Sequence, residues 1–255
     1  MITINGLNIT DNINYLVEEL EYKTMPARNL VYEPISTRPG DKMIAYEWGQ
    51  KEIYFKGRVF GSTPAELQTN VDTLQMNFAV PFVSISIDDG RTYTGTLSEM
   101  SVPTQFYTLS MLEYEARFVC VDPFAYGSAV SVSGTVVSGT TTFSGTVTIS
   151  GTQFAEPTLT IIPAGGSSGD SGIRQMRVYH TPTGEIVTVS GTYNYLTNMV
   201  IDYQNFFVTK DGLQVDYQGI FSRFEPGSVS FEITVISGVK QGYDWVLSYQ
   251  PRYFQ

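Results

Sequence analysis

AEPTLTIIP, residues 155–163, opens the part of the chain that decides the fold of its second half. IRQMRVYHTPTGEIVTVSG, residues 173–191, and MVIDYQNFFVTKDGLQVDYQGIFSRFEPGSVSFEITVISG, residues 199–238, continue it. Tight turns separate runs rich in Val, Ile, Tyr and Phe, namely Thr183-Gly184, Asp211-Gly212 and Pro226-Gly227. β-Branched and aromatic residues fit a pleated, half-buried surface, and such turns favour glycine. The pattern predicts an antiparallel β-sandwich and argues against an α/β enzyme.

The composition limits the kind of protein this chain can be. With 255 residues, the chain is near the size at which one hydrophobic core stops growing, so we expect two domains. Only 16% of the residues are charged, against roughly 25% in an average soluble domain. A surface that is low in charge and rich in Ser, Thr, Gly and Tyr suits a protein that packs against neighbouring subunits.

The charge balance argues against nucleic-acid binding. The net charge is −10, and the 15 Lys and Arg residues are scattered without a run. Binding to a phosphate backbone needs clustered cations. An acidic surface is instead suited to line a pore through which DNA slides, although the sequence alone does not place these charges.

Neither a membrane segment nor a disulfide is expected. The single cysteine, Cys120, lies in the strand-like run EARFVCVDP, which predicts a buried, inert thiol. The first residues, MITINGLNIT, lack the basic and apolar regions of a signal peptide. No stretch approaches the ~20 apolar residues of a membrane helix. We therefore expect a soluble protein made in a cytoplasm.

Residues 1–126 are predicted to form a β-rich domain with a protruding arm. Met1 to Ile9 alternates like a strand. Residues 23–49 contain three prolines, which exclude a central strand and favour an extended hairpin arm with a turn at Pro39-Gly40-Asp41.

One helix is predicted over residues 64–78. Thr63 is a suitable N-cap, Pro64 suits the first helical position, and Glu66 completes a capping box. The apolar residues that follow recur at steps of four, three and four, and so form one stripe: Leu67, Val71, Leu74 and Phe78. The flanking strands are the expected packing partners.

Residues 127–153 repeat Ser-Gly-Thr, at Ser133, Ser138, Ser144 and Ser150. Two readings stay open for this tract: a flexible linker, or edge strands joined by tight turns. The remaining residues, 154–255, are assigned to the sandwich.

Catalytic motifs are scarce, and no cofactor or metal site is expected. His180 is the single histidine, and its position before a Thr-Pro turn is typical of a strand end. Glu18 and Glu19 point to opposite faces of a strand, so a glycosidase pair is disfavoured there. One His and one Cys do not make a zinc site of usual composition. The sequence therefore predicts a protein that is not an enzyme.

The order of these parts resembles the distal tail proteins of siphophages. The matching segments run along nearly the whole chain: Arg38-Pro39-Gly40, Gly57-Arg58-Val59-Phe60-Gly61, Pro157 to Ile162, Thr183-Gly184-Glu185, Ile201-Asp202-Tyr203 and Phe224-Glu225-Pro226-Gly227. Glu225 departs from the family, which commonly has an apolar residue there, and the Ser-Gly-Thr tract is longer than expected.

The resemblance implies a mainly β fold, with a ring-forming N-terminal domain and a galectin-like C-terminal sandwich. It implies a homohexamer at the tail tip of the virion, assembled in the host cytoplasm. Such a ring would join the tail tube protein to tail-associated hub, fibre and receptor-binding proteins, and DNA would pass through it. No specific nucleic-acid or membrane binding is implied.

The arm is the expected subunit interface. Its apolar residues would gain no burial in a solvated loop, so we expect them at subunit contacts, together with Arg38. The predicted contact residues are Met25, Leu30, Val31, Tyr32, Ile35 and Arg38. Two other functions stay open. One is a carbohydrate-binding module, which would stack host-wall glycans on exposed Tyr or Trp. The other is a wall-degrading enzyme, which would need a carboxylate pair.

Overall fold

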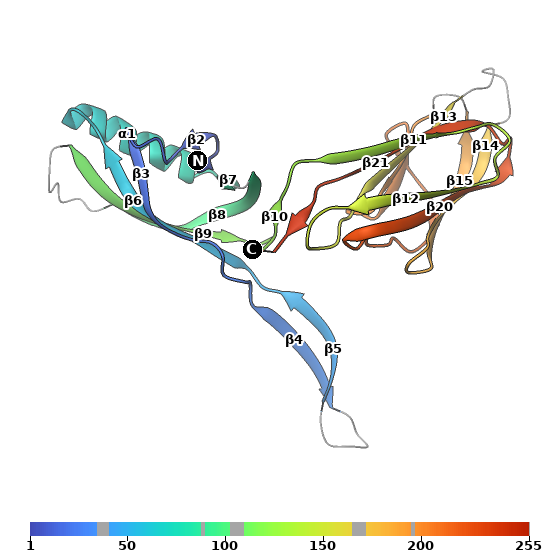
Figure 1. Cartoon of the computed structure of the whole chain (residues 1–255), viewed down its shortest axis with the longest axis horizontal. Coiled ribbons are helices and arrows are strands. Elements are labelled where there is room, and N and C mark those ends of the chain that lie inside the picture. Colours follow the sequence, from blue (N-terminus) through green and yellow to red (C-terminus); the bar gives the residue numbers. More distant parts are fainter. Residues whose placement is uncertain (35–40, 88–89, 103–109, 165–171, 195–196, 255) are drawn as a thin grey trace. The chain divides into compact units, whose positions relative to one another are not determined.

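The computed structural model describes residues 1–34, 41–87, 90–102, 110–164, 172–194 and 197–254. It is mainly β, as predicted, and the described residues contain one helix. The chain divides into two compact units, Met1–Tyr126 with Tyr253–Gln255 and Gly127–Arg252 (Figure 1).

The first unit is built on one antiparallel sheet with the strand order β2-β1-β7-β8-β9-β6-β3, to which β10 is added beside β8, and β22 pairs with β10. Its strands are β1 (Thr3–Ile4), β2 (Leu7–Asn8), β3 (Tyr15–Glu21), β6 (Lys51–Phe60), β7 (Val83–Ile87), β8 (Arg91–Ser101), β9 (Met111–Cys120), β10 (Ala125–Tyr126) and β22 (Arg252–Tyr253).

The N-terminal segment differs from the single strand expected over Met1 to Ile9. It forms the hairpin of β1 and β2, in which Ile4 pairs with Leu7. Asn5 and Gly6 have φ of 50° and 85°. An Asn-Gly pair with two positive φ values makes the tight turn that matches strand twist. The chain therefore reverses where alternation alone suggested that it continues.

Helix α1 (Pro64–Phe78) has the predicted bounds and cap. The Thr63 side chain accepts a hydrogen bond from the Glu66 backbone N–H, which satisfies one of the free donors of the first turn. Phe78 lies edge-on to Phe118 of β9, with ring centroids 5.2 Å apart. The predicted stripe is fully or almost fully buried, and the flanking sheet is its packing partner (Figure 1).

The second unit is a sandwich of two antiparallel sheets. Their strand orders are β11-β21-β13-β16-β17-β18 and β12-β20-β14-β15-β19. The strands are β11 (Val130–Val136), β12 (Thr142–Ile149), β13 (Thr158–Ala164), β14 (Ile173–His180), β15 (Glu185–Tyr193), β16 (Met199–Asp202), β17 (Phe207–Lys210), β18 (Leu213–Val215), β19 (Tyr217–Gly219), β20 (Gly227–Gly238) and β21 (Gly242–Tyr249).

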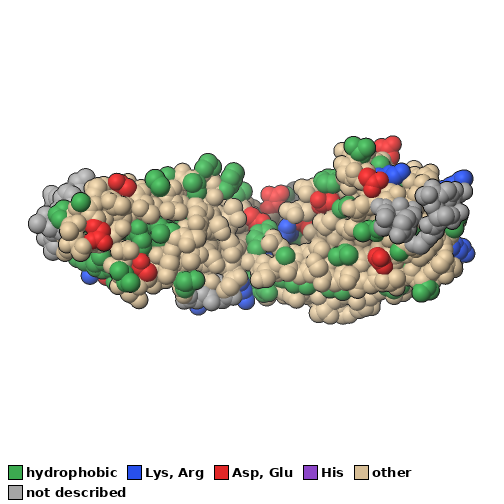
Figure 2. Space-filling model, turned by 90° about the horizontal axis from the view of Figure 1, so that it is seen from above, with side chains coloured by type: hydrophobic (Ala, Val, Ile, Leu, Met, Phe, Trp, Pro, Cys, Tyr) green, Lys and Arg blue, Asp and Glu red, His purple; other side chains and the backbone are tan. Residues whose placement is uncertain are grey.

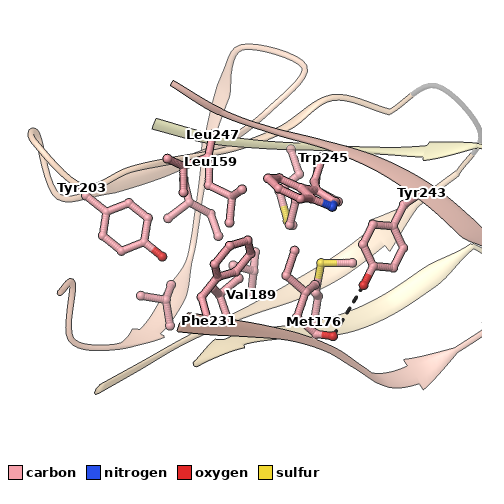
Figure 3. Close-up of a cluster of buried hydrophobic side chains, with 14 of the residues drawn as sticks. Leu159, Met176, Val189, Tyr203, Phe231, Tyr243, Trp245 and Leu247 are labelled. Carbon is pink, nitrogen blue, oxygen red and sulfur yellow. Dashed lines mark hydrogen bonds between the residues drawn. The ribbon is translucent and has the colours of Figure 1, made fainter. Parts of the chain in front are cut away.

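The core of the sandwich lies between its two sheets (Figure 3). Trp245 of β21 packs against Phe231 of β20, with ring centroids 5.3 Å apart. The Tyr243 hydroxyl donates a hydrogen bond of 3.5 Å to the carbonyl of Ile233, which pairs its polar end inside the core. The predicted sandwich is thus present, and its closer likeness to galectins stays a prediction.

The turns predicted in the second half are present. Gly184, Gly212 and Gly227 have φ of 76°, 81° and 108°. These values lie in the left-handed region, which glycine enters at little cost. The Ser-Gly-Thr tract supplies β11 and β12, which are edge strands of the two sheets.

Candidate assembly surfaces

The single histidine is a structural residue in a buried position. His180 is 2% exposed, and its ring lies 4.7 Å from that of Phe224. Its Nδ1 lies 2.7 Å from the Thr183 hydroxyl oxygen, which in turn lies 2.8 Å from a Glu185 carboxylate oxygen. Burial lowers the pKa of His180, and the nearby Glu185 opposes that effect. The neutral ring is therefore favoured in the fold.

The single cysteine, like the histidine, is a structural residue. Burial raises the pKa of Cys120 to about 11, which keeps the thiol protonated, as expected of an inert cysteine. Within the described ranges, no group of three or more His, Cys, Asp or Glu side chains is arranged to hold a metal ion. The one helix of those ranges is not long and apolar enough to cross a membrane.

The exposed face of the first sheet, opposite α1, is acidic. Paired residues of β6 and β9 form salt bridges on this side. Lys56 Nζ lies 3.3 Å from Glu115 Oε1, and Arg58 Nη2 lies 3.5 Å from Glu113 Oε1. The cations on this face are Lys56, Arg58 and Arg117, and carboxylates outnumber them: Glu18, Glu19, Glu21, Glu52, Glu99, Glu113 and Glu115. The expectation that Glu18 and Glu19 point to opposite faces is wrong, because an irregularity in the strand between Val17 and Glu19 brings both to this side. The charges that the sequence left unplaced thus gather here, and they disfavour binding to nucleic acid.

The described residues of the sandwich include no fully exposed Tyr or Trp of the kind that stacks on glycans. Trp245 is 5% exposed, and Tyr193, Tyr203 and Tyr243 are buried. Among the residues of the second unit that the structure describes, every other Tyr is at least partly buried and none is fully exposed.

Figure 2 shows one face of the molecule, on which charged side chains are sparse.

The predicted arm contains a two-stranded sheet of its own. β4 (Arg28–Pro34) pairs with β5 (Asp41–Trp48), and neither pairs with another strand in the described part of the chain (Figure 1). At its base, the Arg28 guanidinium lies over the Trp48 ring at 4.2 Å, and Trp48 contacts Phe254, with ring centroids 4.6 Å apart. The arm is thus anchored by aromatic contacts at one end.

The structure describes the side chains of three of the six predicted interface residues. Met25, Leu30 and Val31 are 63%, 41% and 45% exposed, so their apolar surface is open in the single chain. Tyr32 lies in β4, and its side chain is outside what the structure describes. Ile35 and Arg38 lie outside the described residues, as does most of the predicted turn at Pro39-Gly40-Asp41.

Sequence reasoning missed a second apolar surface, on the sandwich. Phe206, Leu213 and Ile220 are 52%, 75% and 63% exposed. The signal was available in part, because very short strands beside the turn at Asp211-Gly212 are typical of sheet edges.

The two units together define a class of fold. A sheet with one helix and an inserted hairpin, followed by a two-sheet sandwich, is the architecture that the resemblance to siphophage distal tail proteins implied. No protein-family model and no curated protein matches the chain.

A solved structure shares this fold. The chain is similar to the SPP1 Dit (gp 19.1) protein, described as a paradigm of the hub adsorption apparatus in phages that infect Gram-positive bacteria, with a TM-score of 0.72, 15% identity and 98% of each chain covered. It thus has the fold of a siphophage distal tail protein, as predicted. Similarity is weaker to two structures of the phage p2 baseplate in its activated conformation. The structure with Sr has a TM-score of 0.49 and 10% identity, and covers 97% of this chain and 97% of that chain. The structure with Ca has a TM-score of 0.46 and 9% identity, and covers 95% of this chain and 92% of that chain.

Proposed function

We propose that this chain is a structural distal tail protein, a subunit of a hexameric ring at the end of a siphophage tail tube. The ring joins the tail tube protein to the tail-tip hub and to receptor-binding proteins. The observation that carries the proposal is the likeness to the SPP1 Dit protein, because it extends over 98% of both chains and includes both units.

The arm supports a role in assembly. Leu30 and Val31 are neighbours on β4, and both keep about half of their apolar surface exposed in the single chain, at 41% and 45%. A two-stranded hairpin is only marginally stable in water without something to pack against. In the proposed ring, the arm lies on the adjacent subunit and buries Met25, Leu30, Val31, Tyr32 and Ile35 there, with Arg38 near the tip.

The acidic sheet face supports a channel. In a ring that DNA passes through, a lumen of the same sign as the phosphates repels them and prevents adhesion. We assign the exposed face of β3, β6 and β9 to the lumen, with α1 on the outside. A closed ring also pairs or covers the sheet edges, which would otherwise be open to aggregation.

The proposal is tested by locating the protein on the phage particle. Gold-labelled antibodies raised against the full chain are applied to intact virions and viewed by electron microscopy. Label confined to the far end of the tail is the expected result. Label along the whole tube, on the head, or absent from virions would overturn the assignment. A glycan array probed with the purified chain provides the contrast, since the hub function predicts no binding to wall glycans.

A further inference from the structure

Each sheet of the sandwich has two edge strands, and the two pairs of edges differ in chemistry. β11 and β12 end the sheets on one side, and their outward residues are Ser and Thr. These hydroxyls bond across to the next strand, as in Ser131 to Ser248 at 2.8 Å and Thr135 to Asp244 at 2.6 Å. The exposed side chains of these two strands therefore offer a partner little apolar surface.

The opposite edges, β18 and β19, expose large apolar side chains beside polar ones. They are joined by Asp216 alone, so they lie on the same side of the sandwich. Leu213 of β18 and Ile220, which follows β19, are exposed, while Val215 and Tyr217 are partly buried against the core. We name this surface the β18–β19 edge. Exposed edges of this kind are normally protected by charge, proline or a covering segment, because unpaired strands attract others.

Phe206 extends the β18–β19 edge, and its backbone is strained. Its ring lies 5.8 Å from that of Phe221, and its carbonyl accepts a hydrogen bond of 3.1 Å from the Tyr217 hydroxyl. It is 52% exposed, with φ of 58°. A bulky residue in the left-handed region is unfavourable for folding. Since an exposed phenylalanine returns little folding energy, the strain points to a role outside the fold.

The charges around this surface indicate the partner. Asp211 and Asp216 are exposed. Asp216 forms no hydrogen bond or ion pair with any residue that the structure describes. Lys210, the nearest cation in sequence, donates its ammonium proton to the carbonyl of Thr192 at 2.6 Å and lies over the Tyr193 ring. The acidic charge is therefore not balanced locally. It disfavours pairing with the same edge of a second copy, which would bring like charges together, and favours a basic partner.

We propose that the β18–β19 edge is a docking site for an extended, basic segment of a different protein. The segment adds a strand to β18, places alternate apolar side chains on Phe206, Leu213 and Ile220, and directs Lys or Arg toward Asp216. Main-chain hydrogen bonds supply affinity in this mode, and side chains supply specificity. The inference rests on the sandwich alone and holds whether or not the chain belongs to a tail ring.

The test uses isotope-labelled full-length protein and two short synthetic peptides, one of alternating Val and Lys and one of alternating Val and Glu. Addition of the Val/Lys peptide is expected to shift the backbone amide resonances of Leu213–Val215 in NMR spectra, while the Val/Glu peptide leaves them in place. Shifts confined to β11 or β12, equal shifts with both peptides, or no shift at all would overturn the proposal.

Two variants separate binding from folding. Asp216→Lys is expected to weaken Val/Lys binding about tenfold through the reversed charge, while Asp72→Lys, the same change on exposed α1, leaves binding unchanged. Phe206→Asn is expected to weaken binding about fivefold while the unfolding midpoint stays the same or rises, because Asn accepts the left-handed region. A Phe206→Asn protein that unfolds more easily and binds the peptide normally would show that Phe206 serves the fold.

Discussion

The sandwich core and the hairpin arm use apolar residues in opposite ways. Phe231 and Trp245 are 1% and 5% exposed between two sheets that cover each other. Met25 and Leu30 of the arm are 63% and 41% exposed, on a hairpin that pairs with no other described strand. The sandwich contains its own packing partners, whereas the arm leaves apolar surface exposed, which the proposed ring would bury on an adjacent subunit. Apolar content alone therefore does not distinguish a folding core from an assembly surface.

The largest expected effect is on the sandwich core. Phe231→Ala removes a ring packed on Trp245 and Phe143. It is expected to lower the free energy of unfolding of the second unit by about 3–5 kcal/mol, through lost burial and the cavity that remains. Urea denaturation followed by tryptophan fluorescence measures the change. Phe82→Ala is the control, because Phe82 is 78% exposed. A loss under about 1 kcal/mol would show that the sandwich is loosely packed.

A substitution in the arm is expected to change self-association and to leave the stability of the monomer unchanged. Leu30→Asp would place a carboxylate in the proposed subunit contact, which we expect to weaken self-association about hundredfold, equivalent to about 3 kcal/mol. Its unfolding curve as a monomer should match that of the wild type. Analytical ultracentrifugation measures the association.

Met76→Asp is the matched control for the arm. It adds the same charge at an apolar residue of α1 that is 71% exposed and lies outside the proposed contact, so it should leave association unchanged. Equal losses in the two variants would mean that added charge, and not the apolar face of Leu30, controls assembly.

Acid should destabilise the sandwich through His180. Its pKa is lowered in the fold, so the unfolded chain takes up the proton first. Stability is fully present above the unfolded pKa of about 6.5 and falls as the pH drops toward the lower folded value, by at most about 1.4 kcal/mol per pH unit. Unfolding measured through this window should show the slope in the wild type and lose it in His180→Gln. The chain has one histidine, so an unchanged slope in the variant would assign the acid response to carboxylates.

The smallest effect concerns the first unit away from the arm. Thr63→Ala removes the side-chain acceptor for the Glu66 N–H and should cost about 1 kcal/mol. Thr69→Ala, at an exposed position inside α1, should be neutral or slightly stabilising, because alanine is the better helix former. Thermal unfolding by circular dichroism compares the two. If both variants behave alike, the cap does not contribute to stability.

The elements that depend on residues close together in the sequence were predicted correctly. The bounds of α1 follow from Thr63, Pro64 and the apolar stripe, and the turns at Gly184 and Gly212 follow from positive φ. The hairpin at Asn5-Gly6 was missed although its turn residues are as clear, because apolar alternation was given more weight than turn chemistry.

Surfaces depended on pairing between distant strands. The acidic face exists because β6 places Arg58 opposite Glu113 and beside Glu18, which a single strand does not reveal. Phe206 and Leu213 lie in an apolar, strand-like run of the sequence, and the strand order shows that β18 is an edge. Register and strand order are set by the whole fold, so these sites could not be read from short segments.

The central claim is that the chain forms a closed ring by burying its arm on identical copies. The most direct measurement is the mass of the purified full-length protein by native mass spectrometry over a range of concentrations. The account predicts one dominant species, a hexamer of the 28.3 kDa chain, with little beyond it, because a closed ring leaves no free site for growth. A protein that stays monomeric at every concentration, or that grows into open chains of indefinite length, would contradict it.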